Sequence, residues 1–281
     1  MVYEFDDVLA PDSTSTLLKA YGLDPLKFWS QDVRTLIEAG YDPVPAYLTA
    51  LLDNVGEQKP FGNLTNESLR KLGPQLDQNL YPGLPQLFED LSRIASAYKR
   101  IQLEFYIISS GLQELIESST VIQKQFKGVY GTQLAGHSER GPLRHIKRCV
   151  TFTEKTRYLF EINKNIPPHE TIGNPLLVNR QVSRQNRRIP FKNMIFVGDA
   201  LADVPCFSVV KGDGGLTFGV CNSKARMSAR QALESLLSPE RKISVQLPKY
   251  DEKSPLGALL RAAVATRCSQ IQLEHEEISE D

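Results

Sequence analysis

The chain has 281 residues, of which 41% are hydrophobic and 23% are charged, an ordinary composition for a folded globular protein. Its 33 basic residues balance 33 acidic ones, which argues against the long-range positive field of a dedicated nucleic-acid or membrane-surface binder. No apolar run approaches the roughly 18 residues that span a bilayer, and the acidic start does not fit a signal peptide. We therefore expect a cytoplasmic protein with no membrane or nucleic-acid partner.

The cysteines do not suggest a structural framework. Cys149, Cys206, Cys221 and Cys268 are widely spaced, and the chain has no C-x-x-C pair. This spacing argues against both a set of disulfides and a zinc site. We expect the four side chains to act as small buried hydrophobes.

The first part of the chain reads as one short strand followed by helices. Residues 2–5 are apolar, and residues 11–13 carry the signals of a turn and a helix cap. Residues 24–80 place apolar side chains at helical spacing, with Pro and Gly between the helices and no strand pattern. Residues 84–98 follow the i, i+3, i+4, i+7 rule over four turns and predict a further helix.

Strand and helix patterns alternate through the rest of the chain. Residues 103–108 predict a strand that ends before Ser109, Ser110 and Gly111, and residues 126–150 predict a β-hairpin. Further strands are expected at 194–197, 216–220 and 243–247, and further helices at 112–116, 153–162, 226–237 and 256–264.

This order of elements predicts an α/β fold, a Rossmann-like parallel sheet with helices on both faces plus an inserted helical cap domain. The expected core consists of residues 1–12 and 93–281 and includes the hairpin at about 126–150. The expected cap covers residues 13–92.

Acidic residues follow two of the predicted strands. Glu4 and Asp6 come at the end of the first strand, Asp199 follows the strand at 194–197, and Asp203 comes one helical turn later. Ligands of open parallel sheets bind beyond the carboxyl ends of the strands. Four carboxylates gathered there would repel one another unless a cation lay among them, and oxygen-only ligation favours Mg²⁺. The predicted metal ligands are therefore Glu4, Asp6, Asp199 and Asp203.

Four short segments occur in an order that is more informative than any one of them. They are Glu4-Phe5-Asp6-Asp7-Val8, then Ile107-Ile108-Ser109, then Lys155 near the start of a helix, then Gly198-Asp199 with Asp203 four residues on. This ordered set resembles the motifs of the haloacid dehalogenase superfamily of phosphohydrolases, in its phosphoserine-phosphatase-like branch with a helical cap. Each motif is weak alone, and their order carries the resemblance across nearly the whole chain.

The resemblance implies a Mg²⁺-dependent phosphohydrolase that acts on a small phosphorylated metabolite through an acyl-phosphate intermediate. Glu4 would occupy the position of the nucleophile, Asp6 would shuttle the proton, and Lys155 would neutralise charge on the nucleophile and the transferring group. Ser109 would donate a hydrogen bond to a phosphoryl oxygen, with Ser110 as the alternative. The implied catalytic residues are Glu4, Asp6, Ser109 and Lys155, and the implied phosphate ligands are Ser109, Ser110, Gly111 and Lys155.

The sequence departs from the family where the family has an aspartate nucleophile. The extra methylene of Glu4 moves its carboxylate by roughly an ångström, a displacement that can cost about a hundredfold in rate. Ala200 and Ala202 also replace residues common in the family. These departures fit a weak enzyme, an inactive member or a deliberately altered nucleophile. The main alternative is a non-catalytic phosphate-binding or interaction protein on the same fold, and a phosphotransferase is a third reading. The substrate and the oligomeric state stay open.

Three other features have plainer interpretations. Asp7 reads as a turn residue, and the four histidines show no metal-binding spacing. The basic stretch of Arg180, Arg184, Arg187, Arg188 and Lys192 could bind phosphate-rich ligands. Because it lacks interleaved aromatic residues, we read it as a solvated loop.

Overall fold

The computed structural model describes residues 1–199, 202–222 and 244–279. The chain divides into two compact units, the first made of Met1–Leu9, Tyr81–Tyr106 and Phe152–Asp281, and the second of Ala10–Leu80 and Ile107–Thr151. The helix predicted at 226–237 and the departure at Ala200 lie outside the described residues. Within the described parts, no helix combines the length and the apolar character that a membrane span requires.

Four parallel strands form the sheet of the first unit. They are β1 (Val2–Tyr3), β5 (Ile195–Asp199), β6 (Leu216–Val220) and β7 (Ser244–Gln246), and they lie in that order. Tyr3 pairs with Val197, and each residue of β5 pairs with one of β6. The strands predicted at 194–197 and 216–220 are confirmed, because a short continuous apolar run flanked by Gly is typical of a buried parallel strand.

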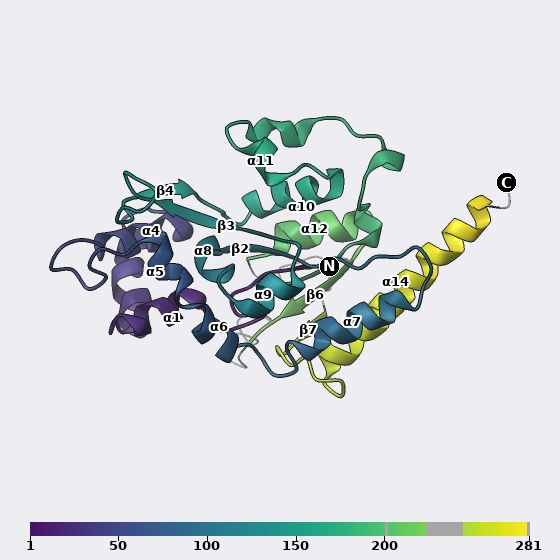
Figure 1. Ribbon diagram of the computed structural model, residues 1–281, viewed down its shortest axis with the longest axis horizontal. Coiled ribbons are helices and arrows are strands. Elements are labelled where there is room, and N and C mark those ends of the chain that lie inside the picture. Colours follow the sequence, from purple (N-terminus) through teal and green to yellow (C-terminus); the bar gives the residue numbers. More distant parts are fainter. Residues whose placement is uncertain (200–201, 223–243, 280–281) are drawn as a thin grey trace. The chain divides into compact units, whose positions relative to one another are not determined.

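Helices cover both faces of this sheet, as the sequence predicted. The Tyr3 ring meets Phe88 of α7 (Gln86–Ser96) edge-on, with 5.9 Å between ring centroids. On the other face, Phe196 meets Phe207 of α12 (Val204–Gly212) at 5.6 Å. Tyr3 and Val197 share a face by register, so Phe196 must point to the opposite face. In Figure 1, α12 lies on one side of β6 and α7 on the other.

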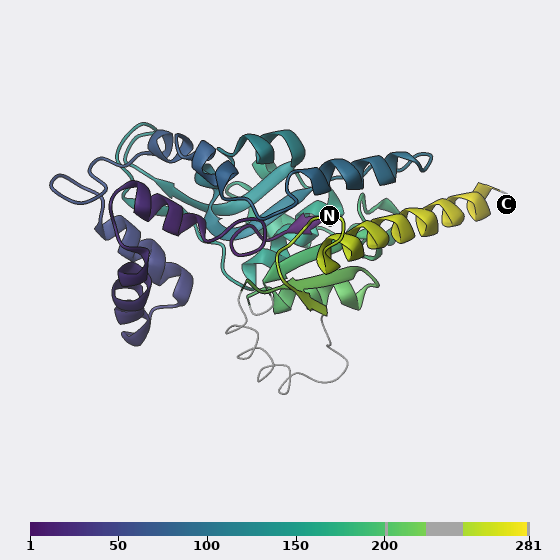
Figure 2. The ribbon, with the colours of Figure 1, turned by 90° about the horizontal axis from the view of Figure 1, so that it is seen from below.

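The C-terminal helix α14 (Pro255–Ser279) packs along α7, and Figures 1 and 2 both show the two helices side by side. The sequence predicted only residues 256–264 as helix, because the apolar spacing fades after Val264. Strong helix formers such as Gln and Glu nevertheless continue the helix. The remaining helices of this unit are α10 (Glu154–Lys164), α11 (Pro168–Thr171), η2 (Pro175–Asn179), η3 (Arg184–Asn186) and η4 (Phe191–Asn193).

The second unit is mainly helical, with a short run of strands. Its strands are β2 (Tyr106–Leu112), β3 (Gly128–Ala135) and β4 (His145–Arg148), and they lie in the order β4-β3-β2. Strand β3 pairs antiparallel with β4, which confirms the predicted hairpin. Its helices are α1 (Ser13–Ala20), α2 (Pro25–Lys27), the π-helix η1 (Phe28–Val33), α3 (Arg34–Glu38), α4 (Pro43–Asp53), α5 (Asn66–Arg70), α6 (Gly73–Gln78), α8 (Gln113–Ile116) and α9 (Thr120–Gln125).

The stretch expected to form the cap holds no strand, since every element between residues 13 and 92 is a helix. The two compact units nevertheless have other bounds than the expected core and cap. Residues 81–92 group with the first unit, and residues 107–151 group with the second. The cap over residues 13–92 therefore stays a prediction.

One strand boundary differs from the sequence-based expectation. Strand β2 covers Tyr106–Leu112, so Ser109, Ser110 and Gly111 lie within a strand and not in the loop after one. The prediction ended the strand at two serines and a glycine, which commonly form turns. Pairing along β3 supplies hydrogen bonds that hold these residues extended, and a new helix begins directly after Leu112.

Candidate active site

Glu4 lies at the carboxyl edge of the parallel sheet in the first unit. Its backbone N–H donates to the Val197 carbonyl at 2.9 Å, which continues the β1–β5 pairing by one residue. Asp199 is the last residue of β5, and it reaches the same edge because the two strands are parallel. Asp6 follows Glu4 by two residues and is half-buried. The predicted gathering of acids at this edge is therefore present for the residues that end β1 and β5.

A lysine bridges two of the predicted carboxylates. Lys155, in the first turn of α10, is only 1% exposed. Its ammonium group donates to Oε2 of Glu4 and, at 2.7 Å, to Oδ1 of Asp203. Glu4 is 4% exposed and its other oxygen, Oε1, accepts from the Phe5 N–H at 2.9 Å. Three charged side chains from distant parts of the chain thus form one buried cluster, Glu4–Lys155–Asp203.

Asp203 is held by the start of α12. It is the N-cap residue of that helix, it is fully buried, and its backbone N–H donates to the Asp199 carbonyl at 3.2 Å. Gly198 makes room for it, because a Cβ at position 198 would collide with Oδ2 of Asp203 and lie 2.6 Å from the Phe196 ring. The Gly-Asp sequence therefore has a steric reason here as well as a chemical one.

The pKa values of Lys155 and Asp203 both differ from their ordinary values in this cluster. Burial alone would lower the pKa of Lys155, but the Asp203 and Glu4 carboxylates outweigh it and hold the pKa above its ordinary value. Burial raises the pKa of Asp203 to about 7; the negative charges of Glu4 and Asp199 add to this rise, and Lys155 opposes it. This edge carries more negative than positive charge, so a cation in addition to Lys155 would be favourable there.

The donor set fits Mg²⁺ in its chemistry. Against the single lysine stand four acids, Glu4, Asp6, Asp199 and Asp203, and Oδ2 of Asp203 is buried with no hydrogen-bond partner among the described residues. No group of three His, Cys, Asp or Glu side chains in the described residues is arranged to hold a metal by itself. Mg²⁺ rarely needs such a cage, since it commonly takes one or two carboxylates, waters and substrate phosphate.

Asp7 has a partner that sequence reasoning missed. It sits in the predicted turn with a left-handed backbone (φ 61°), and the Asn222 side-chain amide donates to its carboxylate. Asn222 comes two residues after β6. No local signal links the two residues, because only the parallel arrangement of strands brings their ends to one edge.

Three of the predicted phosphate ligands, Ser109, Ser110 and Gly111, belong to the second unit, whereas Lys155 belongs to the first. Ser109 is fully buried, and its Oγ accepts from the Gly111 N–H at 3.0 Å. The Oγ of Ser110 is buried without a hydrogen-bond partner among the described residues, and its carbonyl accepts from the Tyr47 hydroxyl. The Ser109 hydroxyl thus accepts a hydrogen bond within β2, whereas the Ser110 hydroxyl makes none with a described residue.

Comparisons with known proteins support the fold. No family model matches the chain. A curated relative of unassigned function from Borreliella burgdorferi is 28% identical over 232 residues, covering 75% of this chain and 77% of that protein.

Two solved structures superpose on most of the chain, each with a TM-score of 0.52. A haloacid dehalogenase (HAD) family hydrolase from Salmonella enterica serovar Typhi matches 81% of this chain at 11% identity. A protein described as a probable phosphoserine phosphatase from Vibrio cholerae matches 96% at 12% identity. This chain spans 64% and 65% of the length of those two chains. With its parallel sheet, two-sided helical cover and acidic strand ends, the chain has the fold of the haloacid dehalogenase hydrolases.

Proposed function

We propose that this protein is a Mg²⁺-dependent phosphohydrolase that acts slowly on a small phosphorylated metabolite. In this proposal Glu4 is the nucleophile, Asp6 the proton shuttle, and Lys155 the cation that offsets charge on the nucleophile and the transferring group. Ser109 or Ser110 donates to the phosphoryl oxygens, with Gly111 beside them. Glu4 and Asp199 supply side-chain ligands to the metal, with Asp6 and Asp203 completing the acidic set.

The observation that supports the proposal most is the buried Glu4–Lys155–Asp203 cluster. Burying ions is expensive, and replacing such a cluster by well-packed apolar side chains is often neutral or stabilising. Stability therefore does not explain why this chain has charges there. Fixed charges in a site of low dielectric are, however, what stabilises the charge that develops in phosphoryl transfer.

The reaction would proceed in two steps. An oxygen of the Glu4 carboxylate forms a bond to phosphorus while the bond from phosphorus to the leaving oxygen breaks, and Asp6 gives the leaving group its proton. Water then attacks the resulting acyl phosphate, releasing inorganic phosphate and restoring Glu4. Bound Mg²⁺ would offset the negative charge of the phosphate during both steps.

The length of the Glu4 side chain explains the slow turnover in this proposal. Its carboxylate is held on both sides, by Lys155 and by the Phe5 N–H. The additional methylene places the attacking oxygen about an ångström from where an aspartate would put it. Phosphate binding depends on the metal, Lys155 and the serine hydroxyls, so it should suffer less than the in-line attack.

The decisive experiment compares the protein with its Glu4→Asp variant in a screen of phosphomonoesters with Mg²⁺. We expect kcat to rise at least about a hundredfold, about 2.7 kcal/mol of barrier, while the substrate Kd changes less than about tenfold. Glu67→Asp, at an exposed position of α5, is the matched control and should change neither value. Equal turnover by the protein and Glu4→Asp would contradict an impaired nucleophile.

The second candidate function is a non-catalytic phosphate-binding protein. It is favoured by the fact that both oxygens of Glu4 already accept hydrogen bonds within the first unit. The same experiment separates the two candidates. Tight binding of phosphomonoesters by both proteins, with no turnover by either, would support the binding protein over the enzyme.

A further inference from the structure

Two adjoining cavities lie in the first unit, away from the acidic edge. A cavity of about 340 Å³ opens beside Ile195, the first residue of β5, and beside Leu103 and Glu104, which precede β2. It is therefore at the amino-terminal edge of the sheet, whereas Glu4 and Asp199 are at the carboxyl edge. The length of β5 separates the two edges by roughly 13 Å, at about 3.3 Å for each residue step.

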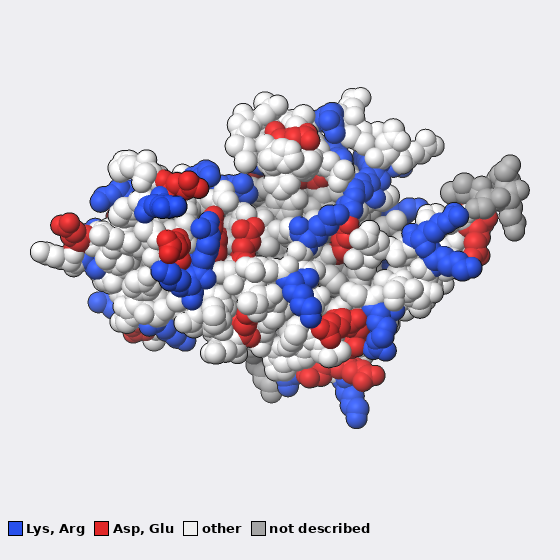
Figure 3. Space-filling model, in the orientation of Figure 1, with Lys and Arg blue, Asp and Glu red and all other residues white. Residues whose placement is uncertain are grey.

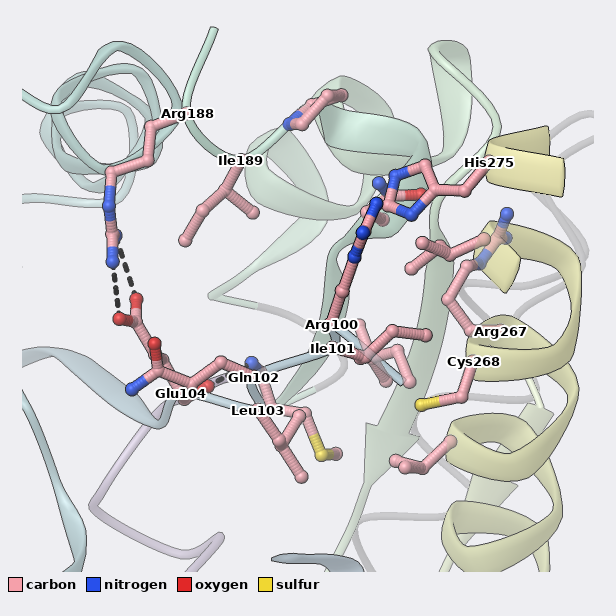
Figure 4. Close-up of a pocket in the computed structure, with 16 residues that line it drawn as sticks. Arg100, Ile101, Gln102, Leu103, Glu104, Arg188, Ile189, Arg267, Cys268 and His275 are labelled. Carbon is pink, nitrogen blue, oxygen red and sulfur yellow. Dashed lines mark hydrogen bonds and ion pairs between the residues drawn. The ribbon is translucent and has the colours of Figure 1, made fainter. Parts of the chain in front are cut away.

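The cavity combines apolar walls with cationic side chains. In the view of Figure 4, the side chains of Arg100, Arg267 and His275 gather at one end, and the ion pair of Arg188 with Glu104 lies at the other. The walls between them include Ile101, Leu103, Ile189, Val264 and Ile271. This mixture suits a molecule with an anionic head and an apolar or aromatic body.

A neighbouring cavity of about 690 Å³ extends the site over the basic stretch noted in the sequence. The two cavities share four lining residues: Arg188, Pro190, Asn193 and His275. The second is also lined by Arg184, Arg187 and Lys192. Figure 3 displays lysine and arginine atoms along this part of the first unit and on α14. The stretch is thus a cavity wall, and not only a solvated loop.

Positive charge is in excess around the two cavities. Three of the lining cations have acidic partners: Arg188 pairs with Glu104, Lys192 with Glu274 at 2.7 Å, and Arg187 weakly with Asp213 at 3.9 Å. The other three, Arg100, Arg184 and Arg267, make no ion pair with any described residue. Among the described lining residues, six lysines and arginines thus face three carboxylates, and Glu274 acts on the charge of Arg267 only from beyond ion-pair distance.

Two of the guanidinium groups also contain a buried N–H without a hydrogen-bond acceptor. The Nε atoms of Arg267 and Arg187 are buried and have no hydrogen-bond partner among the described residues. Arg267 does donate from Nη2 to the Gly214 carbonyl at 2.9 Å, which fixes the orientation of its guanidinium plane. Buried donors are nearly always satisfied, so these two indicate a missing acceptor. A phosphate offers several oxygens to such a planar donor.

We propose that the two cavities form one binding site for an organic phosphate, separate from the proposed active site. Arg100 and Arg267 receive the phosphate group, and the apolar walls around Ile189 and Val264 cover an aromatic or apolar body. Cavities of about 340 and 690 Å³ suit a small molecule better than a nucleic-acid strand or a peptide.

The test is calorimetric titration of adenosine monophosphate in EDTA, which removes any metal-dependent binding at the acidic edge. We expect the Arg100→Gln/Arg267→Gln double variant to bind at least tenfold more weakly than the protein itself. Arg93→Gln, an exposed arginine of α7 in the same unit, is the matched control and should bind as the protein does. If the double variant fails to fold, the exposed Arg184→Gln gives the same test, with about threefold weakening expected.

Two comparisons make the test specific. Inorganic phosphate should bind more weakly than adenosine monophosphate because it has no body to cover, and octanoate should bind more weakly because it has no phosphate. Hydrogen exchange should slow at residues 184–193 and 264–275 when adenosine monophosphate is added. Unchanged affinity in the double variant, tighter binding of octanoate, absence of binding, or protection confined to residues 2–8 would each overturn the proposal.

Discussion

The two edges of the parallel sheet in the first unit carry excess charge of opposite sign. At the carboxyl edge, Lys155 is buried between the carboxylates of Glu4 and Asp203, and acids are in excess. At the amino edge, arginines are in excess, and two of them, Arg100 and Arg267, pair with no described acid. In our proposals, the acidic edge binds a cation together with a phosphate, and the basic edge binds an organic phosphate without a metal.

The difference lies in what each edge needs in order to be stable. The charges of the carboxyl edge have little access to water, so each must be offset by another charge or donor. The amino edge borders open cavities, where water can solvate arginines at little expense. Removing one charge should therefore be severe at the first edge and mild at the second.

The largest effect is expected from Lys155→Met, which leaves two carboxylates buried without their cation. We expect it to lower the free energy of unfolding by about 3–5 kcal/mol, measured by urea denaturation at pH 7. Lys71→Met is the control, because Lys71 pairs with Glu67 on an exposed surface and should cost less than about 1 kcal/mol. A loss as small as that of the control would mean that the cluster is well solvated.

A smaller effect is expected from Gly198→Ala. The added methyl group would press against the Asp203 carboxylate and the Phe196 ring, so we expect about 1–3 kcal/mol of destabilisation by urea denaturation. Gly212→Ala, on α12, meets nothing within 4 Å and serves as the control. Equal stability of the two variants would contradict close packing of Gly198 on Asp203.

Metal affinity is the next measurement. We expect Asp199→Asn to weaken Mg²⁺ binding at least tenfold in calorimetry, about 1.4 kcal/mol, because the amide loses the charge that attracts the ion. Asp53→Asn, at an exposed position of α4, should leave the affinity unchanged. An unchanged affinity in Asp199→Asn would remove that residue from the proposed metal site.

The smallest effect concerns the ion pair between Asp90 of α7 and Arg261 of α14. Arg267, also on α14, pairs with no described acid. Hydrogen bonds from Arg261, then Arg93 and Gln86, lower the pKa of Asp90 to about 2, below its value of about 3.9 in an unfolded chain. The stabilisation is therefore complete above about pH 4 and is lost as the pH falls towards 2.

After allowance for solvent screening, this contribution is about 1 kcal/mol. Asp90→Asn should be less stable than the protein by this amount at pH 6, and the difference should shrink to less than half of it by pH 2. Urea denaturation at both pH values measures it. A difference that does not change with pH would mean that the charge of Asp90 contributes nothing.

The sequence by itself predicted the architecture, and it supplied the acidic residues of the proposed site. The alternation of apolar runs and helical periodicities predicted β5, β6, α7 and the helical stretch before it, because burial on a strand or a helix face leaves a local pattern. The positions of Glu4, Asp6 and Asp199 at strand ends, and of Asp203 one helical turn after Asp199, followed from the same pattern.

Only the tertiary structure decided which groups meet. It joined Lys155 to both Glu4 and Asp203, kept Ser109 and Ser110 inside β2, and brought Asn222 to Asp7. It also assembled the basic cavities from α14, the segment before β2 and the loop before β5. Such contacts leave no local signal in the sequence, because the burial of apolar side chains packs distant segments together. Charged groups on those segments then pair with the polar groups that lie nearest in the folded chain.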